Sequence, residues 1–89
     1  MIETQLTIIN KLGLHARAAA KLSSTAASFG SDIQLGVEGK FVDCKSVMSL
    51  MLLAAAQGRE ITFIIEGKDE ELANETLCAL VNDYFGEGE

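Results

Sequence analysis

The stretch Ile33-Gln34-Leu35-Gly36-Val37-Glu38-Gly39-Lys40-Phe41-Val42-Asp43 sets the predicted architecture. Apolar and polar residues alternate from 33 to 38, which is the pattern of a strand with one buried face. Glu38-Gly39 is a tight-turn signal, and residues 40–43 predict a short returning strand. A hairpin of this kind indicates an antiparallel sheet.

Two further segments alternate in the same way, one before and one after the hairpin. They are residues 2–8 (Ile-Glu-Thr-Gln-Leu-Thr-Ile) and residues 61–66 (Ile-Thr-Phe-Ile-Ile-Glu). Both predict half-buried strands, which brings the expected sheet to four strands.

Three helices are expected between and after these strands. Residues 16–28 are rich in alanine and predict a helix that Gly30 stops. Residues 46–56 form an apolar segment that Ser46 can open as N-cap. A third helix follows Asp69, a candidate N-cap, and ends at Gly86. Its expected apolar stripe consists of Leu72, Thr76, Leu77, Leu80, Val81 and Tyr84.

The order strand, helix, strand, strand, helix, strand, helix (βαββαβα) predicts an α/β two-layer (α+β) open-faced sandwich. Its four-stranded antiparallel sheet would carry three helices on one face and expose the other to solvent. The chain has 89 residues and a hydrophobic fraction of 48%, which fits a single domain over residues 1–89.

Composition excludes several functional classes. The net charge of −6 argues against a nucleic-acid binder. Cys44 and Cys78 lie far apart and away from the one histidine, so neither a zinc site nor a disulfide framework is expected. No metal and no cofactor are expected. The longest apolar run, residues 47–56, is half of the roughly 20 residues that a membrane span needs. A soluble, cytoplasmic protein is expected.

Charge is distributed unevenly along the chain. Residues 1–45 carry five Lys or Arg and four Asp or Glu, whereas residues 46–89 carry two and nine. No acid lies between Thr4 and Ser31, and this interval contains His15. A locally positive region around the only histidine is a hint of an anion site.

His15 directly precedes the first predicted helix, in Gly13-Leu14-His15-Ala16-Arg17. The backbone N–H groups of Ala16 and Arg17 then have no helical partners, and a helix N-terminus attracts anions. The same dipole disfavours the imidazolium form, so a neutral, nucleophilic imidazole is expected. A phosphoryl group taken up by His15 would meet these donors and the Arg17 guanidinium.

The alternative is that His15 is an ordinary residue at a helix start. The chain offers no Ser or Cys nucleophile with an acid to form a triad with His15, and no phosphate-binding glycine motif. Reversible phosphoryl carriage, without an enzymatic activity of its own, is the chemistry that the pattern favours.

The helix that begins after Ser46 is apolar nearly all round, so a domain of this size cannot bury every side chain. We expect a docking patch for partner proteins formed by Val47, Met48, Met51 and Leu52. Two simpler interpretations stay open: a packed core helix with one exposed methionine, and a Ser46 that only caps.

Gly13-Leu14-His15-Ala16-Arg17-Ala18-Ala19 and Lys45-Ser46-Val47-Met48, at this spacing and chain length, resemble the histidine-containing phosphocarrier (HPr) family of the bacterial phosphotransferase system. The resemblance implies an HPr-like fold with strand order 1-4-2-3. It implies that His15, through Nδ1, accepts phosphate from phospho-enzyme I, which draws it from phosphoenolpyruvate, and donates it to enzyme IIA. It also implies that Arg17 assists and that the segment Val47–Leu52 contacts partners.

In many bacteria of this family, an HPr kinase/phosphorylase phosphorylates the serine that matches Ser46, which slows phosphate carriage. The chain departs from the family pattern at Ala18, where proline is usual. His15 excludes the paralogues that lack this histidine. The nitrogen-related branch of the family, a regulatory binding module with an incidental His15, and the sugar served all stay open. A monomer is expected.

Overall fold

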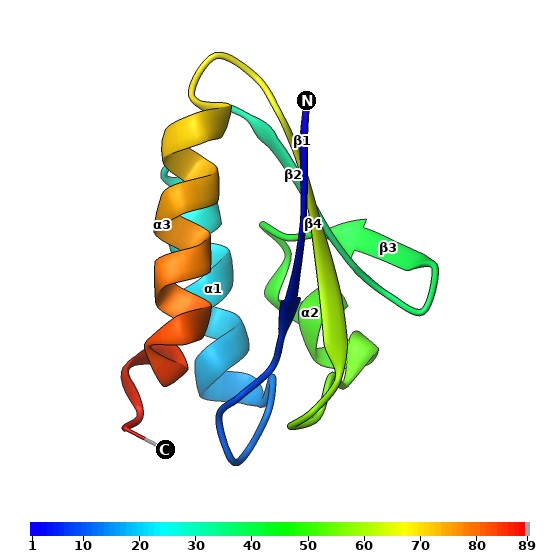
Figure 1. The fold of residues 1–89 in the computed structure, drawn as a ribbon. Coiled ribbons are helices and arrows are strands. Elements are labelled where there is room, and N and C mark those ends of the chain that lie inside the picture. The colour runs from blue at the N-terminus through cyan, green and yellow to red at the C-terminus, as the bar shows by residue number, and fades with distance from the viewer. Residues whose placement is uncertain (89) are drawn as a thin grey trace.

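A computed structural model describes residues 1–88, which form one four-stranded antiparallel sheet with helices on one face (Figure 1). The elements are β1 (Ile2–Thr7), α1 (Ala16–Ala27), β2 (Asp32–Val37), β3 (Lys40–Asp43), α2 (Val47–Leu53), β4 (Glu60–Glu66), α3 (Glu70–Asn82) and the short 3-10 helix η1 (Tyr84–Gly86). The strand order is β1-β4-β2-β3. The predicted open-faced sandwich and strand order are confirmed.

β4 lies inside the sheet and its alternation supplies the centre of the core. It pairs with β1 on one side and β2 on the other, so that Phe63 lies opposite Thr4 and Leu35. Ile61, Phe63 and Ile65 point toward the helices and are fully buried. Alternate burial on one face is what the sequence pattern predicted.

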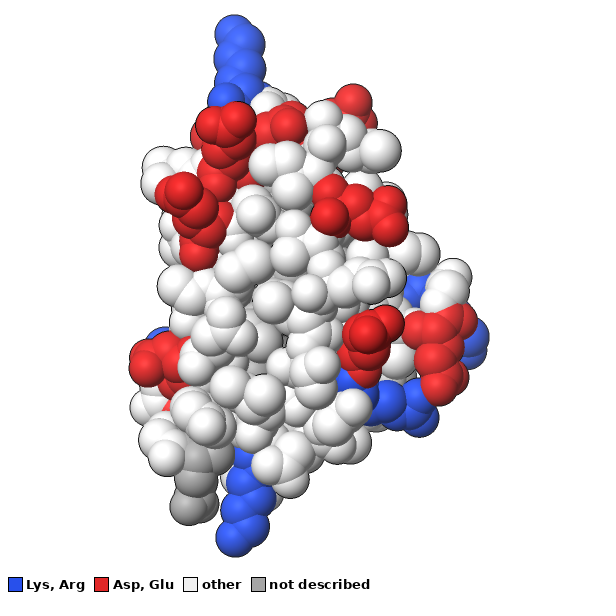
Figure 2. Space-filling view, viewed as in Figure 1, with Lys and Arg blue, Asp and Glu red and all other residues white. Residues whose placement is uncertain are grey.

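The helical layer covers this face, with α1 and α3 lying side by side and α2 beyond α1 (Figure 1). Small residues on α1, namely Ala18, Ala19 and Ala26, are fully buried with Leu22. Their size lets the helix backbone approach the core closely. Acids gather mainly in the upper half of the view in Figure 2, around the β4–α3 connection and the start of α3.

Two helix ends differ from the prediction. α2 ends at Leu53 instead of continuing to residue 56, because Ala54 adopts a left-handed conformation with φ of 52°. The carbonyl of Ala55 then accepts the Leu14 N–H at 2.7 Å, so this segment closes the loop before α1. α1 ends at Ala27 with Ser28 as C-cap, so Gly30 is not the residue that stops it.

The apolar stripe of α3 was predicted only in part. Ala73, Leu77 and Val81 are fully buried, whereas Leu72 is 58% exposed. The helix ends at Asn82, and the buried aromatic residue that follows is Phe85, not Tyr84. The tail therefore turns back onto the domain after α3.

Asp69 holds a turn together in a way that the sequence did not indicate. It occupies the N-cap position of α3 without a capping hydrogen bond from its side chain. Its carboxylate instead accepts from the Gly30 N–H at 2.9 Å, the Ser31 N–H at 3.0 Å and the Ser31 hydroxyl. The residue thus joins the start of α3 to the α1–β2 loop.

The Asp69 contacts predict a loss of stability in acid. Hydrogen bonds, first from the Ser31 hydroxyl and then from the Gly30 N–H, lower the pKa of Asp69 below its usual value. The contribution is complete above the unfolded pKa of about 3.9 and disappears as pH falls through the lower folded pKa. The free energy of unfolding, measured by urea denaturation, should fall less between about pH 7 and about pH 3 for Asp69→Asn than for wild type. Equal drops would contradict the assignment.

Ala18 is the third residue of α1, and a substitution there tests where the helix begins. The first intrahelical bond is donated by Ala19 to the His15 carbonyl, so proline at position 18 removes no helical bond. Ala18→Pro should stabilise by about 0.4–1 kcal/mol, measured by urea denaturation. Ala20→Pro is the matched control and should destabilise by about 3 kcal/mol, because position 20 lies within the helix. Destabilisation by Ala18→Pro would show that the fully buried site cannot hold the ring.

Candidate phosphoryl-accepting site

His15 is the N-cap residue of α1, with φ of −81° and ψ of −178°. Its carbonyl accepts the Ala19 N–H at 2.8 Å, so the N–H groups of Ala16, Arg17 and Ala18 precede the first helical bond. No side chain caps this end of the helix. The described structure therefore presents a set of unpaired backbone donors next to the imidazole, as an anion site requires.

The loop before His15 is fixed by close backbone packing. Gly13 has φ of +66°, and a Cβ there would lie 2.5 Å from the Ala55 carbonyl oxygen. A side chain at this position would be strained and would collide with the backbone. Asn10 donates from Nδ2 to the Gly13 carbonyl at 2.8 Å, and Leu14 N–H bonds to Ala55. The loop thus fixes where His15 lies.

The imidazole makes a contact that the sequence did not indicate. Nε2 of His15 contacts Oε2 of Glu87, which is 72 positions away in the chain. The other carboxylate oxygen of Glu87 accepts from Asn10 Nδ2 at 2.9 Å. An ionised carboxylate only accepts hydrogen bonds, so Nε2 is the donor in this contact and the lone pair of a neutral ring is on Nδ1.

Two shallow hollows border His15. One of about 580 Å³ is lined by Leu12, His15, Ala16, Arg17, Gly86 and Glu87. The other, of about 300 Å³, joins the imidazole to α2 and is lined by residues that include Leu12, Met51 and Ala54. The structure therefore brings His15 and Arg17 together, as expected, and places Met51 at the edge of the same surface.

The α2 surface is apolar and exposed. Val47 is 36% exposed, Met48 69%, Met51 46% and Leu52 82%, and Leu50 is the buried residue of the helix. The interpretation of α2 as a packed core helix with one exposed methionine is therefore wrong. Leu12, 69% exposed, extends this surface on the loop before His15 and was missed, because a single leucine in a loop carries no periodic signal.

Ser46 is the N-cap of α2, as expected. Its hydroxyl oxygen accepts the Ser49 N–H at 3.3 Å, and its carbonyl accepts the Leu50 N–H at 3.1 Å. The half-buried side chain lies at the N-terminus of the helix that carries the exposed apolar residues. A charge placed on Ser46 would therefore lie beside that surface.

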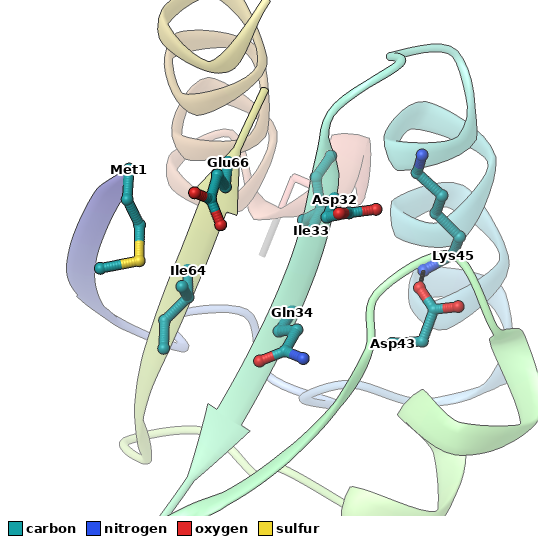
Figure 3. A pocket seen from close by; sticks show the side chains of 8 residues that line it. All are labelled: Met1, Asp32, Ile33, Gln34, Asp43, Lys45, Ile64 and Glu66. Carbon is teal, nitrogen blue, oxygen red and sulfur yellow. Dashed lines mark hydrogen bonds between the residues drawn. The ribbon is translucent and has the colours of Figure 1, made fainter. Parts of the chain in front are cut away.

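A further hollow lies on the open face of the sheet, over β2 and β4 (Figure 3). Its volume is about 530 Å³, and its lining residues are Met1, Asp32, Ile33, Gln34, Asp43, Lys45, Ile64 and Glu66. Lys45 is engaged through Nζ with the Phe29 carbonyl at 2.9 Å. The hollow contains neither His15 nor Arg17 and is not part of the candidate site.

The cysteines take no part in the site. Burial raises the pKa of Cys44 to about 12, and it also raises the pKa of Cys78. Among residues 1–88, no group of three or more His, Cys, Asp and Glu side chains is arranged to hold a metal ion. The helices described in this range are all too short or too polar to cross a bilayer.

Comparisons with known proteins match nearly the whole chain. A family profile described as the PTS HPr component phosphorylation site matches residues 2–83. The phosphocarrier protein HPr of Cupriavidus necator is 48% identical over 89 residues, covering 100% of both chains. The phosphocarrier protein NPr of Shewanella violacea is 42% identical over 86 residues, covering 97% of this chain and 94% of that protein.

Solved structures show the same fold. HPr from Thermoanaerobacter tengcongensis superposes with a TM-score of 0.94 at 42% identity, covering 98% of each chain. A dimer of HPr from that organism matches with a TM-score of 0.78 at 42% identity, covering 98% of this chain and 100% of that one.

Fold and sequence together define a phosphocarrier, a protein that passes a phosphoryl group on without being a catalytic enzyme. The chain belongs to the HPr family of the bacterial phosphotransferase system. The resemblance seen in the sequence is thereby confirmed.

Proposed function

We propose that His15 accepts the phosphoryl group on Nδ1 from phospho-enzyme I and donates it to enzyme IIA components. The observation that carries this proposal is the position of the imidazole beside the uncapped N-terminus of α1. The backbone N–H groups of Ala16 and Arg17 would hold phosphoryl oxygens there, where the helix dipole favours negative charge. No metal or other cofactor is part of the proposed chemistry.

Surfaces of suitable chemistry support the proposed partners. Val47, Met48, Met51 and Leu52 form an apolar patch that reaches the His15 hollow through Met51. A donor or acceptor docked there would bring its own phosphorylated group to the imidazole. We propose that a kinase of the HPr kinase/phosphorylase type modifies Ser46 at the edge of this patch, and that the protein acts as a cytoplasmic monomer.

The direct test is phosphate uptake. Purified protein is incubated with enzyme I and labelled phosphoenolpyruvate, and the product is examined for acid-labile, base-stable label, which is the behaviour of phosphohistidine. We expect stoichiometric label that is transferred onward when enzyme IIA is added. A chain that takes up no acid-labile phosphate would be a binding module with an incidental histidine.

A nitrogen-related role is the second candidate, favoured by the similarity to the Shewanella violacea NPr. The two branches differ in the enzyme I that phosphorylates them faster. Rates measured in parallel with sugar-type and nitrogen-type enzyme I therefore assign the branch, and the sugar-type enzyme is expected to be the faster donor.

Arg17 gives a prediction on transfer rate. Its exposed side chain lies in the same hollow as His15, where a planar, multi-donor guanidinium matches a phosphoryl group better than an ammonium does. Arg17→Lys should slow transfer about tenfold although the charge is kept. Stopped-flow transfer rates should place it nearer to Arg17→Ala than to wild type, with an unchanged melting temperature. Wild-type rates in Arg17→Lys would make Arg17 a solvated helix residue.

A further inference from the structure

The carboxylate of Glu87 makes two contacts, one with His15 and one with Asn10. One carboxylate oxygen contacts Nε2 of His15 and the other accepts from Asn10 Nδ2 at 2.9 Å. The Glu87 side chain is only 12% exposed and that of His15 28%, so the contact is largely shielded from water. A shielded carboxylate–imidazole contact is stronger than a surface ion pair.

The turn after α3 places the Glu87 carboxylate beside the imidazole. Tyr84, Phe85 and Gly86 all have positive φ, at 58°, 53° and 78°, which turns the chain sharply back. Phe85 anchors the turn in the core with 1% exposure. The Glu87 N–H then bonds to the Tyr84 carbonyl at 2.9 Å, which fixes the backbone next to the side chain.

Two non-glycine residues in the left-handed region are unfavourable, each by about 1–2 kcal/mol. Such a conformation persists only where its surroundings require it. Here the buried Phe85 side chain and the two contacts of Glu87 stabilise the left-handed turn. The tail is therefore a fixed part of the site.

Glu87 is charged in this position. Burial works against ionisation, but hydrogen bonds from Asn10 and His15, together with the nearby charge of Arg17, hold the pKa of Glu87 below its usual value. A carboxylate accepts hydrogen bonds and cannot donate them. The proton in the contact therefore belongs to His15 Nε2.

We propose that Glu87 is a positioning residue for phosphoryl transfer, which acts by holding the proton on Nε2 and by balancing the charge of the phosphorylated ring. The inference rests on the proposed function of His15. Because Nε2 keeps its proton, the lone pair of the neutral ring stays on Nδ1, the nitrogen through which transfer is proposed.

Phosphoryl transfer to Nδ1 leaves a positive charge on the His15 ring. The Nδ1 lone pair forms the new bond to phosphorus, and the bond from phosphorus to the donor's leaving group breaks with its electron pair on that leaving group. The ring keeps the Nε2 proton and becomes an imidazolium. Glu87 lies against Nε2, so its negative charge opposes the positive charge that appears on the ring.

Asn10 has a supporting part in the same arrangement. The side chain is fully buried, and its Nδ2 donates both to Glu87 and to the Gly13 carbonyl. It thereby joins the tail to the loop that precedes His15. Asn10 fixes the carboxylate in the orientation in which one oxygen is left for the imidazole.

The test compares Glu87→Gln and Glu87→Ala with a matched control, Glu75→Gln, which removes one charge from the exposed face of α3. Two quantities are measured: the nitrogen-15 chemical shifts of the His15 ring, which report the tautomer, and the rate of phosphate acceptance from phospho-enzyme I. Melting temperatures show that each variant is folded.

We expect wild type and the control to show the proton on Nε2 and equal rates. Glu87→Ala should mix the two tautomers and slow acceptance about tenfold or more, since the ring loses both its orientation and its countercharge. Glu87→Gln keeps an acceptor oxygen without the charge. It should therefore restore the tautomer but only part of the rate.

Three results would overturn the inference: wild-type tautomer in Glu87→Ala, a shifted tautomer with wild-type acceptance, or equal slowing by the Glu75→Gln control. Failure of the proposed function is distinct from these, because wild type itself would then take up no phosphate.

Discussion

Replacing His15 by alanine should abolish phosphoryl acceptance and leave the fold intact. Within residues 1–88, His15 supplies the only imidazole, and the unpaired donors of α1 lie beside it. The histidine side chain makes no capping hydrogen bond to α1, so its loss leaves the helix bonds unchanged. Truncation also removes the shielded contact with Glu87, so we expect a loss of stability of about 1–3 kcal/mol without loss of the fold.

The measurement pairs label uptake from phospho-enzyme I with a melting curve. Ser28→Ala, at the opposite end of α1, is the matched control and should accept phosphate at the wild-type rate. Uptake of acid-labile label by His15→Ala at a comparable rate would refute the assignment. A variant that fails to melt cooperatively would instead show that the imidazole is structural.

The sheet and the starts of all three helices followed from local pattern alone. Ile61, Phe63 and Ile65 alternate in the sequence and are buried together on one face of β4, because the side-chain period of a strand matches the pattern. His15 could also be placed from local pattern, because the alanine-rich segment that predicts α1 begins directly after it.

The contacts that complete the site were not predictable in this way. Asn10 and Glu87 are 77 positions apart, and Glu87 reaches the imidazole only because Phe85 enters the core after a left-handed turn. No periodicity indicates such a turn. A sequence search for a carboxylate partner of His15 would have had to consider the tail as well as nearby acids.

The early end of α2 has the same origin. Residues up to 56 are helix formers, but the Ala55 carbonyl is needed by the Leu14 N–H in the loop before His15. A tertiary hydrogen bond therefore overrides local helix propensity. The consequence for the site is useful, because Ala54 and Met51 then border the hollow beside the imidazole.

Changes on α2 should act on partner binding instead of on the imidazole. Ser46→Asp keeps an N-cap oxygen for the Ser49 N–H, and aspartate is as good a cap as serine. The added negative charge is favoured by the helix dipole, so the melting temperature should stay the same or rise slightly. Docking over the patch would require that charge to be desolvated or paired.

Met48→Asp separates the patch from the cap. Met48 is 69% exposed at the start of α2, and the substitution leaves Ser46 unchanged. Leu72→Asp is the matched control, since Leu72 is 58% exposed on α3 and lies outside the patch. A charge placed against an apolar partner surface should slow transfer about tenfold, which is about 1.4 kcal/mol.

We therefore expect Ser46→Asp and Met48→Asp to slow both acceptance from enzyme I and donation to enzyme IIA, while Leu72→Asp transfers at the wild-type rate. The nitrogen-15 shifts of the His15 ring should not change in any of the three variants, because the charge acts on docking. Rates rising with partner concentration toward the wild-type limit would locate the defect in binding. If Ser46→Asp and Met48→Asp transfer as fast as wild type, partners dock elsewhere and Ser46 serves only as the N-cap of α2.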